Sequence, residues 1–389
     1  MKLFVILSRV PYPLEKGDKL RAFNQIKQLS KKHQIVLFAL NDSKLDERAM
    51  DELKKYCVSI TIIRFSKFTI FLNLIRTLFS TKPFQVGYFY FSKAQQKVDE
   101  LIKKHQPDHI YCQLIRTSEY VKNYSNIPKT LDYMDVFSKG IERRKSTDSF
   151  YMKPFLAFEY RRLLKYESYV FDFFNHKTII SEQDKNHIPH ANKNEITVVP
   201  NGVDFEYFKP IALEKKFELL FNGNMNYPPN VESVEFLVNK IMPLVWEKLP
   251  ETKLLISGAS PNKKVLALQS SRVVVSGWVD DIRNNFAQSK ILVAPMQISI
   301  GLQNKLLEAM AMQIPCVTST LANNAIGALH NNQIMVADTP SQYADYIIEL
   351  LTDAQKAKQI ALNGYRFSNT NFNWSTSISI LDKLISKKK

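Results

Sequence analysis

The sequence predicts an α/β protein of two domains, each built around a parallel β-sheet. A chain of 389 residues is long enough for two domains of ordinary size. Residues 2–8 and 33–40 read as buried strands that flank an amphipathic helix over residues 21–31, which is how a parallel α/β sheet begins. A Pro-Asn-Gly turn follows at residues 200–202, and residues 219–222 then open a second strand–loop–helix pattern.

Composition narrows the class of protein. Cys57, Cys112 and Cys316 are far apart and show neither a disulfide framework nor a metal-ligand spacing, which fits a reducing compartment, no metal and no cofactor. The chain holds no apolar run of about eighteen residues, so no transmembrane helix is expected. The short apolar run at residues 3–7 is followed by Arg9, which favours a buried first strand over a signal peptide. We therefore expect a cytoplasmic protein.

The net charge of +16 is unevenly placed along the chain. Residues 1–200 hold 34 Lys and Arg against 21 Asp and Glu, a net of +13, whereas the remainder carries +3. A basic half predicts an anionic partner such as a membrane surface, a lipid diphosphate or a nucleic acid. No nucleic-acid-binding motif is visible, so no nucleic acid is expected. The alternative is a lysine-rich composition without a partner.

Three candidate residues of the first half stand where strands end, and parallel sheets bind ligands at the carboxyl ends of their strands. Gly17 lies at the loop-to-helix transition after the first strand, although it could simply shape a turn. Asp132 and Asp135 end a strand predicted over residues 130–135 and are expected to orient substrate hydroxyls as catalytic residues. The alternative is that one of them caps the next helix.

Two segments of the first half are both basic and apolar. Residues 65–79 are too apolar for an ordinary surface helix, and Lys67, Asn73 and Arg76 interrupt them too often for a bilayer span. An interfacial helix and a core helix packed on the sheet both fit this segment. Residues 141–174 alternate basic and aromatic side chains, which suits an anionic membrane surface.

The second half repeats the strand–loop–helix pattern. Gly223 and Asn224 open the loop after its first strand, where backbone N–H groups can meet phosphates. Helices are predicted over residues 231–241 and 342–351. The predicted strands cover residues 219–222, 253–257, 273–276, 291–295 and 316–319.

Residues 299–315 are the most informative stretch. They read as a loop with one glycine, then a largely buried helix of about three turns that stops at Pro315. Gly301 lets an anion approach the N–H groups at the helix start, and Lys305 adds a positive charge beside them. Glu308, one turn deeper, can accept hydrogen bonds from hydroxyls. Phosphate donors beside a hydroxyl acceptor suit a nucleotide sugar, and an i,i+3 ion pair on a solvated face is the alternative.

Two sequence stretches carry a family resemblance. GLQNKLLEAMAMQIPCV at residues 301–317 and VVPNGVD…F-x-P at residues 198–210 resemble family-4 retaining glycosyltransferases, which have the GT-B fold. The resemblance implies that Lys305 contacts the donor diphosphate and that Glu308 contacts the ribose. It also implies a donor site that includes the following residues: Gly17, Gly223, Asn224, Gly277, Trp278, Val279, Gly301, Leu302, Gln303 and Asn304.

The resemblance is incomplete at two places. The family's first glutamate is replaced by Ile300, so the usual sugar contact is missing. In the strand at residues 108–113, Tyr111 stands where the family has a histidine near the sugar. The first loop, PYPLEKG…R, resembles the family loop that approaches the donor phosphates and acceptor, which implies acceptor-binding roles for Asp18 and Arg21, with Tyr111 as a third acceptor residue.

The sequence thus predicts a GT-B enzyme with two Rossmann-like domains facing a central cleft. The predicted parts are an acceptor domain at residues 1–204, a donor domain at 205–368 and a returning C-terminal helix at 369–389. The expected reaction is metal-independent, retaining transfer of a sugar from a nucleotide sugar to a lipid-linked or polysaccharide acceptor. The expected place is the inner face of the cell membrane. A noncatalytic GT-B scaffold and a GT-B nucleotide-sugar epimerase are the alternatives.

Overall fold

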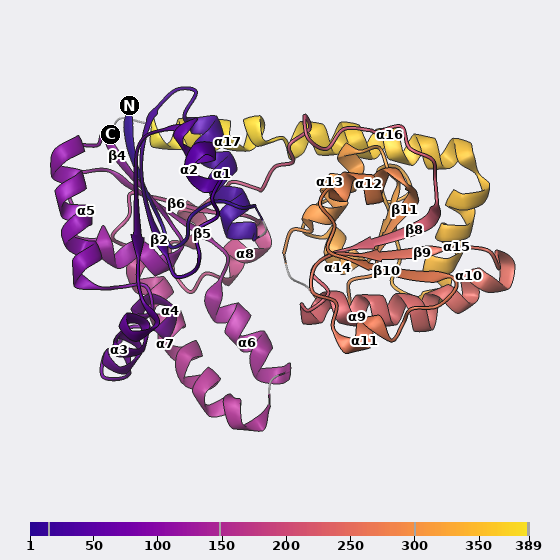
Figure 1. Cartoon of the computed structure of the whole chain (residues 1–389), viewed down its shortest axis with the longest axis horizontal. Helices are drawn as coiled ribbons and strands as arrows, with labels where there is room; N and C mark the ends of the chain where they lie inside the picture. The colour runs from indigo at the N-terminus through magenta and orange to yellow at the C-terminus, as the bar shows by residue number, and fades with distance from the viewer. Residues whose placement is uncertain (15, 148, 299–300, 387–389) are drawn as a thin grey trace. The chain divides into compact units, whose positions relative to one another are not determined.

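The computed structural model describes residues 1–14, 16–147, 149–298 and 301–386. The chain forms two compact units (Figure 1). Unit 1 contains Met1–Pro200 and the residues from Ser377 onward, and unit 2 contains Asn201–Thr376. Each unit holds one parallel sheet with helices packed against it, as the repeated strand–loop–helix pattern predicts.

The sheet of unit 1 has seven parallel strands in the order β3-β2-β1-β4-β5-β6-β7. Its central strands are nearly continuous apolar runs because helices cover both faces of a parallel sheet; all of β1 after Lys2 is buried. The strands are β1 (Lys2–Leu7), β2 (Gln34–Asn41), β3 (Cys57–Arg64), β4 (His109–Gln113), β5 (Lys129–Met134), β6 (His176–Ile179) and β7 (Thr197–Val198).

The helices of unit 1 differ from the predicted ones mainly at their ends. The first helix begins at Gly17 rather than at residue 21. The basic and aromatic segment forms two helices that pack on each other, α6 and α7. The helices are α1 (Gly17–Leu29), α2 (Ala49–Lys54), α3 (Lys67–Leu78), α4 (Phe84–Gly87), α5 (Ser92–His105), η1 (Ile115–Tyr120), α6 (Phe137–Thr147), η2 (Phe150–Met152), α7 (Lys153–Phe171), α8 (Glu182–His187) and η3 (Lys193–Glu195).

Helix α3 buries polar side chains and exposes apolar ones, which is the reverse of an ordinary surface helix. Its two buried residues are polar, Asn73 and Thr77. Its large apolar side chains face outward, with Phe68 exposed by 69%, Phe71 by 59% and Leu78 by 52%. A core helix would bury these side chains, so that alternative for residues 65–79 is wrong.

The C-terminal end of α3 is held firmly in spite of its exposed apolar face. Arg162 of α7 donates from Nη1 to the carbonyl oxygens of Thr77 (2.8 Å) and Lys82 (3.0 Å), and from Nη2 to those of Leu78 and Ser80. A cation that binds the last carbonyls of a helix satisfies groups that have no partner within the helix. Arg162 therefore ties the C-terminal end of α3 to α7.

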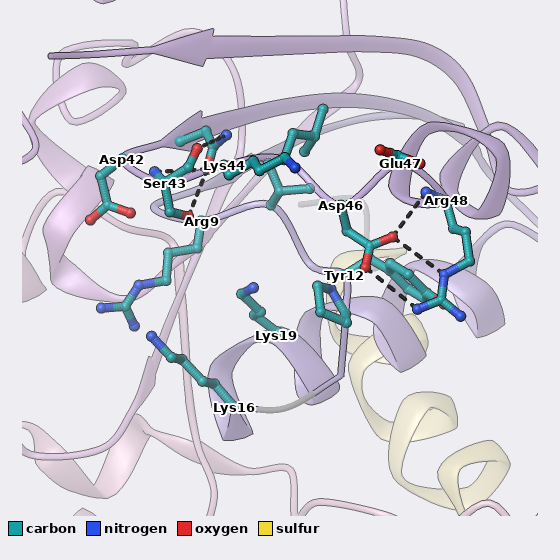
Figure 2. Close-up of a pocket in the computed structure, with 14 residues that line it drawn as sticks. Arg9, Tyr12, Lys16, Lys19, Asp42, Ser43, Lys44, Asp46, Glu47 and Arg48 are labelled. Atoms are coloured by element: carbon teal, nitrogen blue, oxygen red, sulfur yellow. Dashed lines mark hydrogen bonds and ion pairs between the residues drawn. The ribbon is translucent and has the colours of Figure 1, made fainter. Parts of the chain in front are cut away.

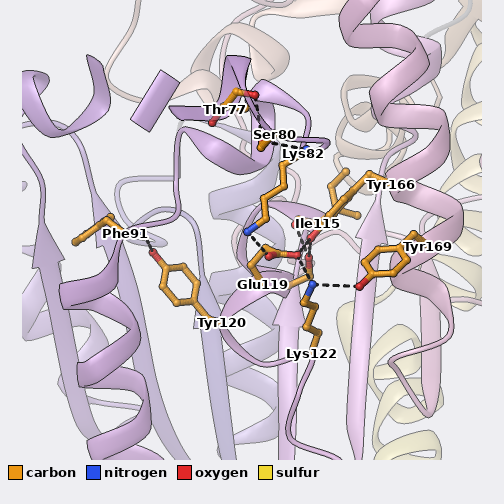
Figure 3. Close-up of polar contacts among 11 residues, drawn as sticks. Thr77, Ser80, Lys82, Phe91, Ile115, Glu119, Tyr120, Lys122, Tyr166 and Tyr169 are labelled. Carbon is orange, nitrogen blue, oxygen red and sulfur yellow. Dashed lines mark hydrogen bonds and ion pairs between the residues drawn. The ribbon is translucent and has the colours of Figure 1, made fainter. Parts of the chain in front are cut away.

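A polar cluster anchors the segment that follows α3 (Figure 3). Glu119 of η1 lies 2.5 Å from Lys82 Nζ and 2.9 Å from Lys122 Nζ, and it accepts a hydrogen bond from Tyr166 OH of α7 at 2.8 Å. Burial alone would raise the pKa of the Glu119 carboxyl, but these donors and charges hold it below its usual range. The cluster joins η1, α7 and the α3–α4 connection.

Unit 2 has a six-stranded parallel sheet in the order β10-β9-β8-β11-β12-β13. Its strands are β8 (Phe217–Asn222), β9 (Leu254–Ser257), β10 (Val273–Gly277), β11 (Ser289–Ala294), β12 (Cys316–Thr318) and β13 (Met335–Val336). Its helices are α9 (Pro228–Phe236), η4 (Leu237–Ile241), α10 (Met242–Lys248), α11 (Lys263–Leu266), α12 (Ile282–Ala287), α13 (Asn304–Ala311), α14 (Thr320–Asn323), α15 (Pro340–Thr352) and α16 (Ala354–Asn371), and the last helix of the chain is α17 (Trp374–Ile385).

The unit boundaries fall at other residues than the sequence suggests. The linker belongs to unit 2 from Asn201 onward, because Val203 N donates to Phe372 O at 2.6 Å and Gly202 packs against Trp374. Helix α16 also stays with unit 2, where Ser368 Oγ donates to Leu307 O of α13 at 3.4 Å. The chain joins unit 1 from Ser377, and Asp382 there binds Lys32 Nζ and His33 Nε2, each at 2.7 Å.

Candidate functional site

Each sheet contains one point where the strand order reverses direction, and the crevice there is the usual ligand site of an open parallel sheet. In unit 2 this point lies between β8 and β11. The loops that leave these two strands lead to Gly223 and to helix α13, so the two phosphate-binding stretches predicted from the sequence meet there.

Two glycines bring the loops of β8 and β9 into close contact. Gly258 has φ +136°, and a Cβ atom on it would lie 1.7 Å from the carbonyl oxygen of Gly223. A Cβ atom on Gly223 would lie 2.6 Å from Asn230 Nδ2 and 3.1 Å from Lys305 Nζ. Only glycine fits this spacing, and the lysine amine therefore lies directly against the backbone of the β8 loop.

Lys305 is a buried cation with a neutral partner. Its Nζ donates to Asn230 Oδ1 at 2.8 Å and lies 4.3 Å from the centre of the Phe221 ring. Within the described residues no carboxylate lies within ion-pair distance of it. Burial lowers the pKa of Lys305 to about 7, which the charge of Glu308 only partly offsets. A desolvated ammonium group without an anion is suited to receive one.

Glu308 lies on the same face of α13, and the predicted alternative of a solvated ion pair is not what forms. Glu308 is partly buried, and Lys305 donates to Asn230 instead. Burial raises the pKa of the Glu308 carboxyl to about 7, and Lys305 acts in the opposite direction. Asn304 Oδ1, at the start of the same helix, is buried without a hydrogen-bond partner. Buried polar atoms without a protein partner normally form hydrogen bonds to a ligand or to water.

The remaining predicted donor residues of unit 2 surround this point. Gly301 has φ +73°, and Gln303 Nε2 donates to its carbonyl oxygen at 3.2 Å. Gln303 precedes α13 without capping it through its side chain. The amide of Asn224 is engaged locally, since its Oδ1 accepts from Asn226 N at 2.9 Å. Ile300, the position of the missing family glutamate, and its neighbour Ser299 lie outside the described residues.

The predicted base-binding loop stands at the end of β10. Trp278 is 65% exposed, and open space surrounds the Cα of Gly277, which has φ +69°. Gly277 O accepts from Gly258 N at 3.0 Å, so this loop connects through Gly258 to the loop of Gly223. Val279 and Leu302 are partly exposed on their own loops.

In unit 1 three of the predicted catalytic and acceptor residues form a buried network instead of a binding surface. The side chains of Asp132 and Arg21 are 0% exposed, and the two are joined by Nε–Oδ2 at 2.7 Å and Nη2–Oδ1 at 3.1 Å. Tyr111 OH donates to Asp132 Oδ2 at 2.8 Å, and Thr178 Oγ1 donates to Oδ1 at 2.9 Å. The predicted substrate contacts of Asp132, Arg21 and Tyr111 are wrong, because every oxygen of the carboxylate is used inside the domain.

Electrostatics supports this structural role. Burial alone would raise the pKa of the Asp132 carboxyl, but the charge of Arg21 and the hydrogen bonds outweigh burial and lower it. Burial raises the pKa of Tyr111 well above its usual range. The network ties helix α1 to strands β4, β5 and β6.

Asp135 and Gly17 keep an accessible position at the carboxyl end of the sheet, whereas the side chain of Asp18 is largely buried. Asp135 is exposed, and its Oδ1 accepts from Val136 N at 2.7 Å. Gly17 is exposed and a Cβ atom there would meet only Met134 Cε, at 3.6 Å, so nothing in this space requires a glycine. Asp18 binds Arg9 Nη1 at 2.7 Å.

Sequence reasoning missed three polar residues that the structure places at these crevices. Asn230 holds Lys305, although the two are 75 residues apart. Arg9 and Arg116 follow β1 and β4, the two strands at which the order of the first sheet reverses. The sequence signal that could have identified Arg9 and Arg116 is their position just after a predicted strand. Cavity-lining residues around Arg9 enclose about 600 Å³ (Figure 2).

The described part of the chain offers neither a metal-binding cluster nor a membrane-spanning helix. No three His, Cys, Asp or Glu side chains gather there as a metal site. None of the helices in that part combines the length and the apolar character needed to cross a membrane. Cys57, Cys112 and Cys316 are unpaired.

Comparison with known proteins relates unit 2 to a glycosyltransferase family and the whole chain to one curated relative. Residues 216–353, most of unit 2, match the family model described as "Glycosyl transferases group 1". An uncharacterized 44.6 kDa protein in the cps region of Klebsiella pneumoniae is 24% identical over 397 residues, which cover 95% of this chain and 96% of that protein.

Solved structures show the same fold over the whole chain. HepE of Anabaena in complex with UDP has a TM-score of 0.68 at 14% identity, over 99% of this chain and 100% of that one. WaaG, a glycosyltransferase involved in lipopolysaccharide biosynthesis, has a TM-score of 0.66 at 14% identity, with both chains fully covered. The chain has the GT-B fold, and together with the group 1 match this supports a glycosyltransferase.

Proposed function

We propose that the protein is a retaining glycosyltransferase of cell-surface glycan synthesis. It takes a sugar from a nucleotide-sugar donor bound by unit 2 and transfers it to a lipid-linked or polysaccharide acceptor bound by unit 1. The retaining stereochemistry rests on the resemblance of residues 301–317 to family-4 enzymes. The relative in a cps region and the bound UDP and UDP-glucose of HepE support the substrate class.

The environment of Lys305 carries the proposal. Its amine is buried, is held by a neutral amide and lies beside the glycine backbone of the β8 loop and the start of α13. A donor diphosphate at this point would receive the lysine charge and the N–H groups of the helix start together. As the sugar–phosphate bond breaks, negative charge grows on the leaving diphosphate, and preorganised positive groups stabilise it.

In this proposal Lys305 binds the donor diphosphate and Glu308 binds the ribose. The carboxylate is placed one helical turn from the amine, where it can accept hydrogen bonds from ribose hydroxyls. The charge on the leaving group is met by Lys305 and the helix start, so the proposed reaction needs no metal ion. The donor sugar, its base and the acceptor are left to experiment.

The direct test is product analysis. The purified protein is incubated with a panel of nucleotide sugars and a membrane extract as acceptor source, and the products are identified by mass spectrometry. We expect one nucleotide sugar to be consumed with release of nucleoside diphosphate and with the sugar linked in the donor's anomeric configuration. Conversion of the nucleotide sugar without an acceptor would point to an epimerase, and no binding of any nucleotide would point to a scaffold; either result would contradict the proposal.

We also propose that unit 1 attaches to an anionic membrane surface at the cytoplasmic side. Its outward apolar residues belong to α3, to the residue after it, to η2 and to the start of α7. Unit 1 is also net positive, since residues 1–200 carry +13. These exposed residues are Phe68, Phe71, Leu72, Ile75, Leu78, Phe79, Phe150, Tyr151, Met152, Phe155 and Phe158. An apolar face of this size with basic flanks suits the interface of a bilayer with anionic lipids.

Sedimentation with liposomes tests the membrane proposal. The protein is expected to pellet with anionic liposomes, less so at high salt, and the double variant Phe71→Ser/Phe79→Ser is expected to bind about tenfold more weakly or worse, because each ring would lose its burial in the interface. Leu266→Ser is the matched control, since Leu266 is 49% exposed in unit 2. Equal loss in both variants, or no binding at any salt concentration, would refute membrane attachment by this face.

A further inference from the structure

A second cavity adjoins the one around Arg9 in unit 1. It encloses about 320 Å³ and shares Arg9 and Asp42 with the first cavity. The two have different linings. The first is mainly polar and basic, with Lys16, Lys19 and Arg9 reaching into the same space (Figure 2). The second is bounded by apolar side chains of α3, α4, α6, η2 and α7, which include Leu74, Phe84, Ile141, Met152, Phe155 and Leu156.

The junction of the two cavities holds two arginines. Arg9 and Arg116 share one carboxylate, Asp18, which lies 2.7 Å from Arg9 Nη1 and 4.0 Å from Arg116 Nη1. The two carboxylates that line the second cavity are already engaged. Asp42 accepts from Tyr88 OH at 2.9 Å, and Glu159 accepts from the backbone N–H groups at the start of α4.

Arg116 donates its side-chain hydrogen bonds to a neutral group, and the nearest carboxylate oxygen of Asp18 lies 4.0 Å from its Nη1. Its Nε and Nη2 both donate to the neutral amide oxygen of Gln85, at 3.0 and 2.8 Å, and its guanidinium lies 4.7 Å from the centre of the Phe137 ring. Burial lowers the pKa of Arg116 to about 10, and the neighbouring charge of Arg9 acts in the same direction. The backbone before it is strained, since Leu114 has φ +64°. Such groups are held in place for an anion.

The apolar side of the second cavity is continuous with the outward apolar face of unit 1. Met152 and Phe155 line the cavity and are also exposed, by 39% and 44%. Leu74 belongs to α3, the helix whose apolar residues point outward. A path lined by apolar groups therefore runs from the exposed face to the arginine pair, and a polar cavity lies beyond it.

We propose that Arg9 and Arg116 bind the phosphate of an amphiphilic acceptor, whose hydrocarbon chain lies along the second cavity toward the exposed face and whose sugar end enters the first cavity. The inference rests on the proposed function, because it names the acceptor class of that transferase: a lipid phosphate or diphosphate. The arginine pair bridges the polar and apolar parts of such a molecule as the two cavities require.

Binding measurements on the full-length protein test this subsite. Calorimetry with dodecyl phosphate below its critical micelle concentration is compared with inorganic phosphate and with dodecyl glucoside, which is neutral. We expect dodecyl phosphate to bind at least about tenfold more tightly than either, since only it offers both the charge and the chain. Arg116→Gln should weaken dodecyl phosphate binding about tenfold or more, because a charge-assisted contact is lost. Leu74→Ser should weaken dodecyl phosphate but leave inorganic phosphate unchanged.

The controls separate this subsite from the proposed function. Arg161→Gln changes an exposed arginine of α7 outside both cavities and should bind all probes as the unaltered protein does. Circular dichroism checks the folding of every variant, and UDP binding by unit 2 is measured in each as the test of the donor site. UDP binding without preference for dodecyl phosphate, or an unaffected Arg116→Gln variant, would overturn the subsite and leave the transferase proposal standing. Equal affinity for inorganic phosphate would assign the site to free phosphate.

Discussion

Replacement of Lys305 by methionine is expected to weaken UDP binding by about 10- to 100-fold, because a charge-assisted contact to the diphosphate is removed. Turnover should fall further, by about 10² to 10³, since the same charge stabilises the leaving group in the transition state. Methionine keeps the apolar stem and removes the desolvated ammonium group, so the domain should fold. Lys248→Met, in the last turn of α10, is the matched control on the surface of the same unit. Unchanged affinity and turnover in Lys305→Met would remove Lys305 from the site.

Proton uptake gives a second readout of the same lysine. The pKa of Lys305 is about 7 in the free protein, so at pH 8 most of its amines are neutral. A bound diphosphate favours the ammonium form and raises that pKa, and UDP binding at pH 8 should therefore take up close to one proton, which is about the limit for one lysine. Above pH 7 the affinity should fall with rising pH, by up to about tenfold per unit. Calorimetry in buffers of different ionisation enthalpy measures the uptake, which Lys305→Met should abolish.

Replacement of Asp132 by alanine is expected to destabilise unit 1 by about 3–5 kcal/mol, because it leaves the guanidinium of Arg21 buried and unpaired. A loss of this size is a large part of the stability of an ordinary domain, about 5–15 kcal/mol. Urea unfolding followed by circular dichroism measures it. The pKa of Asp132 is lowered in the folded state, so its stabilising contribution is complete above the carboxyl's ordinary pKa and is lost as pH falls through the lower folded value.

A double variant separates a structural role for Asp132 from a catalytic one. Arg21→Gln/Asp132→Asn replaces two buried charges by two amides that can still hydrogen-bond, and most of the stability should return. Because Asp132 is buried and both of its carboxylate oxygens bond within unit 1, the recovered protein should also keep its transferase activity. A double variant that is folded but inactive would restore the catalytic role predicted from the sequence.

Several strands of both units and the buried helix at residues 304–311 followed from local sequence. Apolar runs such as residues 2–7 and 291–294 bury both faces of a strand and read the same wherever they occur. The loop with Gly301, followed by an apolar helix with Lys305 on its first turn, can likewise be recognised from a short stretch of sequence. The bounds of helix ends and of the units did not follow, because these depend on contacts such as that of Gly202 with Trp374.

Three features were decided by tertiary packing alone. Asp132 and Asp135 lie three residues apart, yet one is fully buried and the other exposed, because Asp132 lies within β5 and pairs with Arg21 of α1, whereas Asp135 follows the end of the strand. Arg21 and Asp132 are 111 residues apart. Helix α3 has a composition that suits a core or an interface, and only the structure shows that its apolar side chains face outward while Arg162 binds its last carbonyls.

By itself, the sequence determined two parallel α/β units and a largely buried helix after the Gly301 loop, since strand burial and helix starts are written in short stretches of neighbouring residues. Only the tertiary structure decided which charges are available to a ligand. Whether a charged side chain near a strand end stays available to a ligand depends on its partners from distant parts of the chain. Lys305 donates to an amide and has no counter-ion among the described residues, whereas Asp132 pairs with an arginine and is part of the core.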